Sequence, residues 1–347
     1  MMETLWFWLV ALMLAGYVVF DGFDLGAGIV HLYVARDDDQ RRLVLRSIGP
    51  VWDGNEVWLL AAGGTLYFAF PALYASAFSG FYLPLMIVLW LLILRGCSIE
   101  FRHHVEARAW KPFWDVVFSG ASLLLSIFLG AALGNVVRGV PLPATGYFFL
   151  PLWENLTLGP PTGIIDWYTL MTGVLAGLAL LQHGALWVAH KTGDPIRRRA
   201  RRAAAHAFWG VLAMTAAVTL VTFRIQPQVT ARLGAAPWGY LFPAVAVGGL
   251  LAARLLVRAG RDGWAFLASC LYLCGMLLSA AFGLYPYVLP STLDPRFGLT
   301  VGNAAAAEAG LRVGLTWWIP GMILVAAYFT FVYRRFRGRV RLAGDGY

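Results

Sequence analysis

Charged residues are scarce in this chain. Only 13% of its 347 residues are Asp, Glu, Lys or Arg, whereas 60% are hydrophobic; an average soluble domain carries roughly 25% charged residues. This composition excludes a soluble globular protein. Cysteine is also rare. Cys97, Cys270 and Cys274 all lie inside apolar runs, so they do not form the disulfide framework of a small secreted domain.

The chain also lacks the pattern of a cleavable signal peptide. Residues 1–4 contain no basic residue, and the first apolar run continues into Asp21-Gly22-Phe23-Asp24 instead of a small-residue cleavage site. We therefore expect this run to be a transmembrane helix.

Long apolar runs make up most of the sequence. A transmembrane helix needs about 20 predominantly apolar residues, and nine segments meet that need. The predicted spans are residues 5–34, 49–70, 74–103, 113–138, 162–191, 198–226, 238–258, 263–288 and 310–336. The sequence thus predicts an all-α polytopic membrane protein with nine transmembrane helices.

Basic residues are distributed unevenly between the loops. If the N-terminus lies outside, the inside loops hold 21 Lys and Arg residues and the outside loops hold five. Because basic residues collect on the cytoplasmic side, this asymmetry predicts an N-out, C-in orientation. The net charge of +9 is then a consequence of topology, and we expect no nucleic-acid partner.

A long linker after the fourth span divides the chain. We expect two four-helix bundles with a peripheral ninth helix. The predicted segments are a first bundle with the acidic motifs at 1–141, an outside linker at 142–161, a second bundle at 162–290, and an outside loop, ninth helix and basic cytoplasmic tail at 291–347.

Two acids lie within the first span. Asp21 and Asp24 are three residues apart, so they share one face of the helix. A carboxylate at the bilayer centre costs roughly 2.5–3.5 kcal/mol, and Gly22 and Gly26 allow another helix to approach closely. We expect both acids to be buried between helices. The alternative is that the apolar part of the helix ends at Phe20 and both acids lie in the interface.

A second acidic pair begins the second span. Pro50 suits a helix start, which places Asp53 and Glu56 on one face of the first two turns. Favourable interaction with the helix dipole is a simple alternative role for them. With the N-terminus outside, the acids of both pairs fall in the cytoplasmic half of the membrane. Such acids are typical of proton relays, and they could equally bind a cation.

Arg95 is a further charge inside the third span, with Glu100 five residues later. An intramembrane arginine needs a carboxylate partner. Asp53 and Glu56 on the preceding span are the partners that we expect for it.

Several motifs resemble one known family. The most specific are Asp21-Gly22-Phe23-Asp24-Leu25-Gly26 and Trp52-Asp53-Gly54-Asn55-Glu56-Val57-Trp58. Further matches are residues 77–82, 95–102, 134–135, 139–141 and 285–291. In these motifs the chain resembles subunit II of the cytochrome bd-type quinol oxidases, densely over the first 141 residues and thinly afterwards.

The resemblance implies a respiratory terminal oxidase of a bacterial or archaeal plasma (inner) membrane, which oxidises quinol and reduces dioxygen to water. It implies a haem-free chain with no catalytic residue, no metal site and no firmly bound cofactor of its own. The partner is a haem-bearing subunit I that holds haem b and haem d. A small single-helix subunit, a quinone or lipid bound by this chain, and the choice of ubiquinol or menaquinol stay open.

The resemblance also implies roles for individual residues. Asp24 and Asp53 match acids of a proton path toward the oxygen-reducing haem of the partner, and Asp21 stands beside them. Glu56 occupies a position where family members carry Gln or Glu, so it adds a carboxylate to the predicted path. Trp58 matches a residue at a dioxygen route or helix interface.

Two other functions would use the same features. A proton-coupled secondary transporter would use the acids for ion coupling, although such proteins usually have broken helices in both halves. A b-type haem cytochrome would use His183 and His190, which are seven residues apart on the fifth span. Such histidines more often form hydrogen bonds to a neighbouring helix.

Overall fold

The protein is a bundle of long helices in the computed structural model, which describes residues 1–342. The end of the predicted cytoplasmic tail, 343–347, lies outside the described residues. The helices are α1 (Met2–Val34), α2 (Asp38–Ile48), α3 (Trp52–Ala69), α4 (Pro71–Gly80), α5 (Tyr82–Phe101), α6 (Trp110–Arg138), α7 (Trp167–Lys191), α8 (Ile196–Ile225), α9 (Pro227–Ala235), α10 (Leu241–Arg258), α11 (Asp262–Leu284) and α12 (Glu308–Arg335).

Extended structure is minor. Strands β1 (Tyr287–Leu289) and β2 (Leu299–Thr300) form an antiparallel pair in the segment between α11 and α12. Two short 3-10 turns, Pro237–Tyr240 and Pro295–Phe297, complete the elements. The predicted all-α class is therefore confirmed for the described part of the chain.

Eight helices within residues 1–342 are long and apolar enough to cross a membrane: α1, α5, α6, α7, α8, α10 with its preceding turn, α11 and α12. Helix α3 occupies the second predicted span but is not among them. Its 18 residues include Asp53, Asn55 and Glu56, and these polar side chains lower its mean hydropathy. A ninth crossing by α3 stays a prediction.

The third predicted span, 74–103, is wrong as a single helix. It is broken at Phe81 into α4 and α5. Pro84 in the first turn of α5 has no N–H to donate to the carbonyl of Gly80, four residues earlier. The backbone N–H of Leu150 donates to that carbonyl instead, at 3.2 Å. A segment from the distant loop thus replaces the missing helical hydrogen bond.

Two other expectations need correction. The eighth predicted span ends at Leu284 instead of residue 288, because Pro286 cannot donate a helical hydrogen bond and the chain turns into β1. The short helices α2 and α9 were not predicted. They contain only 11 and 9 residues, respectively, and are too short to appear as apolar spans.

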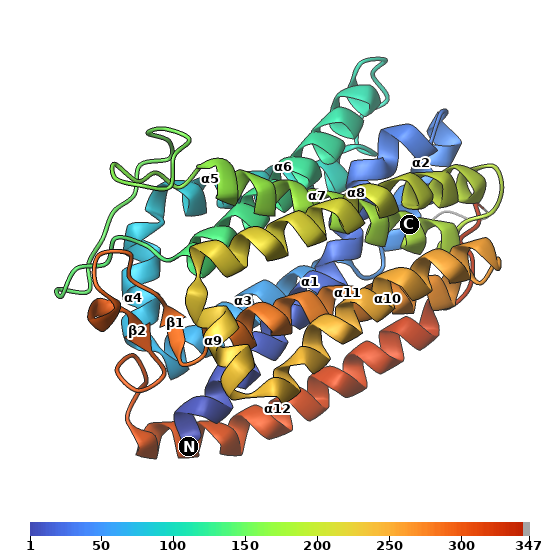
Figure 1. Ribbon diagram of the computed structural model, residues 1–347. Helices are drawn as coiled ribbons and strands as arrows, with labels where there is room; N and C mark the ends of the chain where they lie inside the picture. Colours follow the sequence, from blue (N-terminus) through green and yellow to red (C-terminus); the bar gives the residue numbers. More distant parts are fainter. Residues whose placement is uncertain (343–347) are drawn as a thin grey trace.

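Helix α1 packs through the interior of the bundle, and α12 runs along its outside (Figure 1). The contact of α1 with α7 is a backbone contact. A Cβ atom on Gly26 would lie 1.9 Å from the carbonyl oxygen of Leu180 and 2.6 Å from the nitrogen of Gly184. The close approach predicted at Gly22 and Gly26 is therefore confirmed. On α12, only Leu311 and Gly314 are fully buried.

This contact predicts that Gly26→Ala will destabilise the protein. The added methyl group has no space, so α1 and α7 must separate, and the polar side chains of α1 must shift with them. We expect a lower melting temperature in detergent and a lower yield of folded protein. Gly248→Ala is the control, because nothing lies within 4 Å of a Cβ there and alanine favours helix by about 1 kcal/mol. Equal melting temperatures for the two variants would contradict the prediction.

Candidate functional site

A buried ion pair joins α1 to α5. Arg95 donates to the two carboxylate oxygens of Asp21 at 2.9 and 2.5 Å, and neither side chain is exposed. Two parallel hydrogen bonds of this kind are the strongest geometry for an arginine–carboxylate pair. They compensate the cost of removing both charges from water.

The predicted partners of Arg95 are confirmed in part: Glu56 forms an ion pair with it, whereas Asp53 does not within residues 1–342. Glu56 lies nearby, with its Oε2 atom 3.7 Å from Arg95 Nη1 and its side chain 25% exposed. Asp53 is exposed on the outer face of α3 and forms no hydrogen bond or ion pair within residues 1–342. The first partner is Asp21, on a helix that the sequence did not suggest. Glu100 is half-buried in the last turn of α5.

Asp24 belongs to a second arrangement, which joins α1 to α3 and α12. Its Oδ2 atom accepts a hydrogen bond from the side-chain amide of Asn55 at 2.8 Å. The amide oxygen of Asn55 accepts from the hydroxyl of Tyr333 at 2.9 Å. The other oxygen of Asp24 is buried with no partner among the described residues. A buried carboxyl with a free oxygen can take up a proton or accept a hydrogen bond from water.

The chain of hydrogen bonds from Asp24 ends at a cavity. Tyr333 lines a space of about 340 Å³ between the α2–α3 junction, the end of α7 and the segment after α12. Two side chains therefore separate the buried carboxyl from this cavity. Asn55 lies inside the motif of residues 52–58, but Tyr333 is 278 residues further along the chain. No local pattern indicates that the two meet.

Trp58 lies among aromatic side chains of α1 and α12. Its ring stacks on Phe20 with the centroids 5.4 Å apart and meets Phe329 edge to face at 5.6 Å. The ring also covers Gly16, where a Cβ atom would lie 3.1 Å away. Trp58 thus fills an interface between three helices.

His183 does not present a free ring nitrogen. Its Nδ1 atom is hydrogen-bonded to the Ser269 hydroxyl at 2.7 Å, and its Nε2 atom to the Val19 carbonyl at 3.0 Å. Haem ligation through this residue would have to break a buried hydrogen bond. The simpler prediction, that this histidine bonds neighbouring helices, is confirmed.

A buried carboxylate on α6 was not predicted from the sequence. Asp115 is unexposed and accepts hydrogen bonds from His31 at 2.8 Å, Arg41 at 3.0 Å and Arg102 at 2.7 Å. His31 follows Asp24 by seven residues, so the same helical face carries both. That spacing is the signal that could have indicated this cluster.

Arg102 extends the cluster toward α2. It donates to Asp38 at 2.7 Å. Burial acts to raise the pKa of the Asp38 carboxyl, but the hydrogen bond and charge of Arg102 outweigh it, so the pKa lies below its usual range. The cluster holds α2 and α6 against the end of α1.

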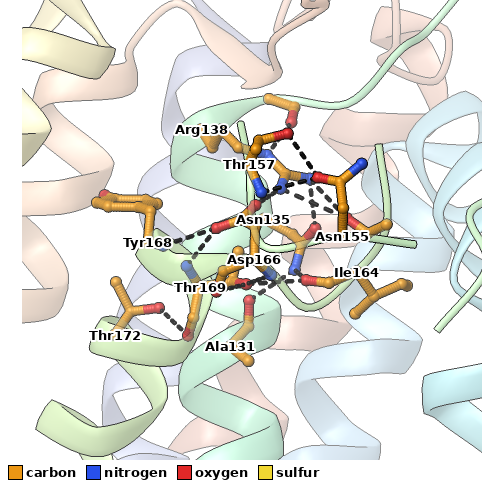
Figure 2. Close-up of polar contacts among 12 residues, drawn as sticks. Ala131, Asn135, Arg138, Asn155, Thr157, Ile164, Asp166, Tyr168, Thr169 and Thr172 are labelled. Carbon is orange, nitrogen blue, oxygen red and sulfur yellow. Dashed lines mark hydrogen bonds and ion pairs between the residues drawn. The ribbon is translucent and has the colours of Figure 1, made fainter. Parts of the chain in front are cut away.

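Another polar cluster joins α6 to the start of α7 (Figure 2). Asp166 forms an ion pair with Arg138 and accepts from the backbone N–H groups of Tyr168 and Thr169 at 2.7 and 2.8 Å. Asn135 donates to the carbonyl of Ile164 at 2.9 Å. These bonds cap α7 and hold the preceding loop. No group of three or more His, Cys, Asp or Glu that could hold a metal occurs in the described chain.

Comparisons with known proteins agree with one another. A family model described as cytochrome bd terminal oxidase subunit II matches residues 2–336. The probable cytochrome oxidase subunit 2 of Haemophilus influenzae is 30% identical, over 98% of this chain and 95% of the relative. The cytochrome bd-I ubiquinol oxidase subunit 2 of Escherichia coli is 29% identical over the same shares. The cytochrome bd ubiquinol oxidase subunit 2 of Bacillus subtilis is 31% identical, over 90% and 89%.

A solved structure shows the same fold. A chain in the structure of the bd oxidase from Geobacillus thermodenitrificans matches with a TM-score of 0.75 at 21% identity, over 96% of this chain and 98% of that chain.

The buried ion pair predicts a stability effect that depends on both partners. Asp21→Asn removes the carboxylate that binds buried Arg95 through two hydrogen bonds, and removing one partner of a buried pair typically costs about 3–5 kcal/mol. We expect a clear drop of the melting temperature in detergent. Replacing both residues, as Asp21→Leu with Arg95→Met, should recover part of the loss because the buried arginine without its main partner is then absent. A double variant less stable than Asp21→Asn alone would contradict this explanation.

Proposed function

The chain belongs to the cytochrome bd terminal oxidase subunit II family, and from this premise we propose that it brings protons from the cytoplasm to a haem-bearing partner. As a family member it is a multi-pass membrane subunit of a quinol:oxygen oxidoreductase. In such an enzyme quinol is oxidised and dioxygen is reduced to water. The family match favours this function over a secondary transporter or a separate haem cytochrome.

The partner is a subunit I that carries haem b and haem d. The outer face of α3 supports the presence of a partner subunit, since it exposes Asp53 beside Val57 and Leu60, which are 52% and 73% exposed. A carboxylate at membrane depth does not persist against lipid. We propose that subunit I covers this face, and that the haems lie on its side of the interface.

The observation that carries the proton path is the position of Asp24. It is fully buried, has one oxygen without a partner among the described residues, and is held through Asn55 and Tyr333 beside the cavity at the end of α12. We propose that Asp24 takes up protons that enter from this side and passes them toward Glu56 and then Asp53, while the Asn55 amide orients the carboxyl and does not itself carry a proton. Both of these carboxylates lie on α3, and Asp53 lies on the face assigned to subunit I.

Asp21 has a different role in this proposal. Its two oxygens both accept hydrogen bonds from Arg95, so it holds the arginine charge near the path. Arg95 in turn lies 3.7 Å from Glu56 and forms an ion pair with that carboxylate. Trp58 closes the interface beside the path, where a dioxygen route is also proposed. Glu100 is proposed as a further charge of this region on α5.

The membrane arrangement is a further part of this proposal. We propose nine crossings, with α3 as the second and α12 as the peripheral ninth, in an N-out, C-in orientation. The first bundle would comprise residues 1–141 and the second 162–290. The excess of basic residues in the loops assigned inside supports this orientation.

The proton path predicts that Asp24→Asn will lower turnover while the complex still assembles. Asparagine keeps the size of the side chain and can still accept from Asn55, but it does not ionise. Quinol-dependent oxygen consumption should fall by about 100-fold or more, while haem content stays normal. Asp24→Glu should keep part of the activity. Both quantities are measured on the same purified two-subunit complex.

The same assay applies to Asp53→Asn. Loss of this proton carrier should lower oxygen consumption. Because Asp53 has no partner among the described residues, the substitution should not lower the stability of this chain. Glu308→Gln, an exposed position on α12, is the control for a lost carboxylate. Wild-type turnover in both Asp24→Asn and Asp53→Asn would show that these acids are not the proton route.

The orientation predicts which loops are accessible from outside the cell. In a chain with its three cysteines replaced, Gly159→Cys and Gly193→Cys each add a probe at a position with nothing within 4 Å of the Cβ. A membrane-impermeant maleimide should label residue 159 in intact cells, and residue 193 only after the membrane is opened. The reverse pattern would contradict the N-out orientation.

A further inference from the structure

The cavity beside Tyr333 is strongly cationic. Its lining contains Arg46, Lys191, Arg335, Arg337 and Arg339, together with His190, and no acidic residue of the described part of the chain lines it. Lys191, Arg335, Arg337 and Arg339 form no ion pair within residues 1–342. A cavity of about 340 Å³ with this charge favours an anion that carries several acceptor oxygens.

Two polar contacts hold Lys191 and the segment after α12 at this lining. Lys191 is buried, and its Nζ atom donates to the carbonyl of Phe336 at 2.5 Å. The backbone N–H of Val340 donates to the carbonyl of Lys191 at 2.8 Å. These bonds hold the segment after α12 over the cavity. The acceptor of the Lys191 ammonium group is a neutral carbonyl, so this bond brings no carboxylate to the wall of the cavity.

An apolar groove adjoins the cavity on the outside of α12. It is lined by Ala326, Ala327, Thr330 and Phe331, and it ends at Arg334 and Arg335. Arg335 lines both the groove and the cationic cavity. Phe331 is 68% exposed, so this side of α12 is open. The two spaces together are complementary to an amphiphile: the cationic cavity fits an anionic head, and the groove fits an apolar chain.

We infer that this site binds an anionic phospholipid. The phosphate of the headgroup occupies the cationic cavity, and an acyl chain lies along the groove of α12. Basic pockets between helices on the cytoplasmic side of membrane proteins bind such headgroups. The lipid then joins the end of α12 to α7 and to the α2–α3 junction. This inference rests on the chain spanning a membrane and is independent of the proton path.

The experiment measures retention of phosphatidylglycerol by the purified two-subunit complex. The complex is delipidated, exchanged into phosphatidylcholine nanodiscs with graded phosphatidylglycerol, and bound lipid is counted by native mass spectrometry. The test variant is Arg337→Gln with Arg339→Gln. The control is Arg258→Gln with Arg261→Gln, which removes the same charge from exposed residues outside the cavity lining. Both pairs remove the same general attraction to an anionic surface, but only the test pair removes charges that line the cavity. At about fivefold for each basic residue beside a headgroup, the test variant should bind at least about tenfold more weakly than the control.

A second variant tests the acyl chain separately from the charge. Ala327→Trp fills the groove at an exposed position and should also reduce phosphatidylglycerol retention, with oxygen consumption unchanged. Equal retention by the cavity and control pairs would overturn the inference. So would displacement of the lipid by inorganic pyrophosphate together with normal retention in Ala327→Trp, since the ligand would then be a soluble phosphate.

Discussion

Burial of ionisable side chains along α1 is the constraint on which the rest of the structure depends. Asp21, Asp24 and His31 have no exposed surface, and a buried charge or polar group without a partner costs several kcal/mol. Each side chain therefore needs a polar partner from another helix. The partners are Arg95 of α5, Asn55 of α3 and Asp115 of α6. Providing polar partners for the side chains of α1 thus sets the position and rotation of three other helices.

The backbone contact of α1 with α7 completes this constraint. Neither Gly26 nor Gly184 has room for a side chain, so α1 can be rotated or translated very little against α7. That restriction keeps Asp24 directed at Asn55 and Asp21 directed at Arg95. A charge network and a close-packed glycine contact on the same helix consequently support each other. Small residues are what allow membrane helices to approach this closely.

An acidic region and a cationic region lie side by side in the protein. Asp21, Asp24 and Glu56 lie among α1, α3 and α5, whereas the cationic cavity lies where α7 and α12 end. Tyr333 belongs to both regions, since it lines the cavity and donates to Asn55. The proposed proton entry and the proposed phospholipid site are therefore neighbours. An anionic headgroup there would moderate the positive potential that a proton meets on its way to Asp24.

Properties of single segments could be predicted from the sequence, because an apolar run and a three-residue spacing lie within one helix. These include the membrane class, most long helices, and the burial of Asp21 and Asp24. Partner choice could not be predicted, since periodicity indicates a helical face but not the helix that meets it. Arg95 pairs with Asp21, 74 residues away, and Asp53 lies outward on the same helix that directs Asn55 inward. The break at Phe81 likewise involves a distant segment, since Leu150 donates the hydrogen bond that the Gly80 carbonyl accepts. Only the tertiary structure decides such contacts, because packing alone brings distant segments together.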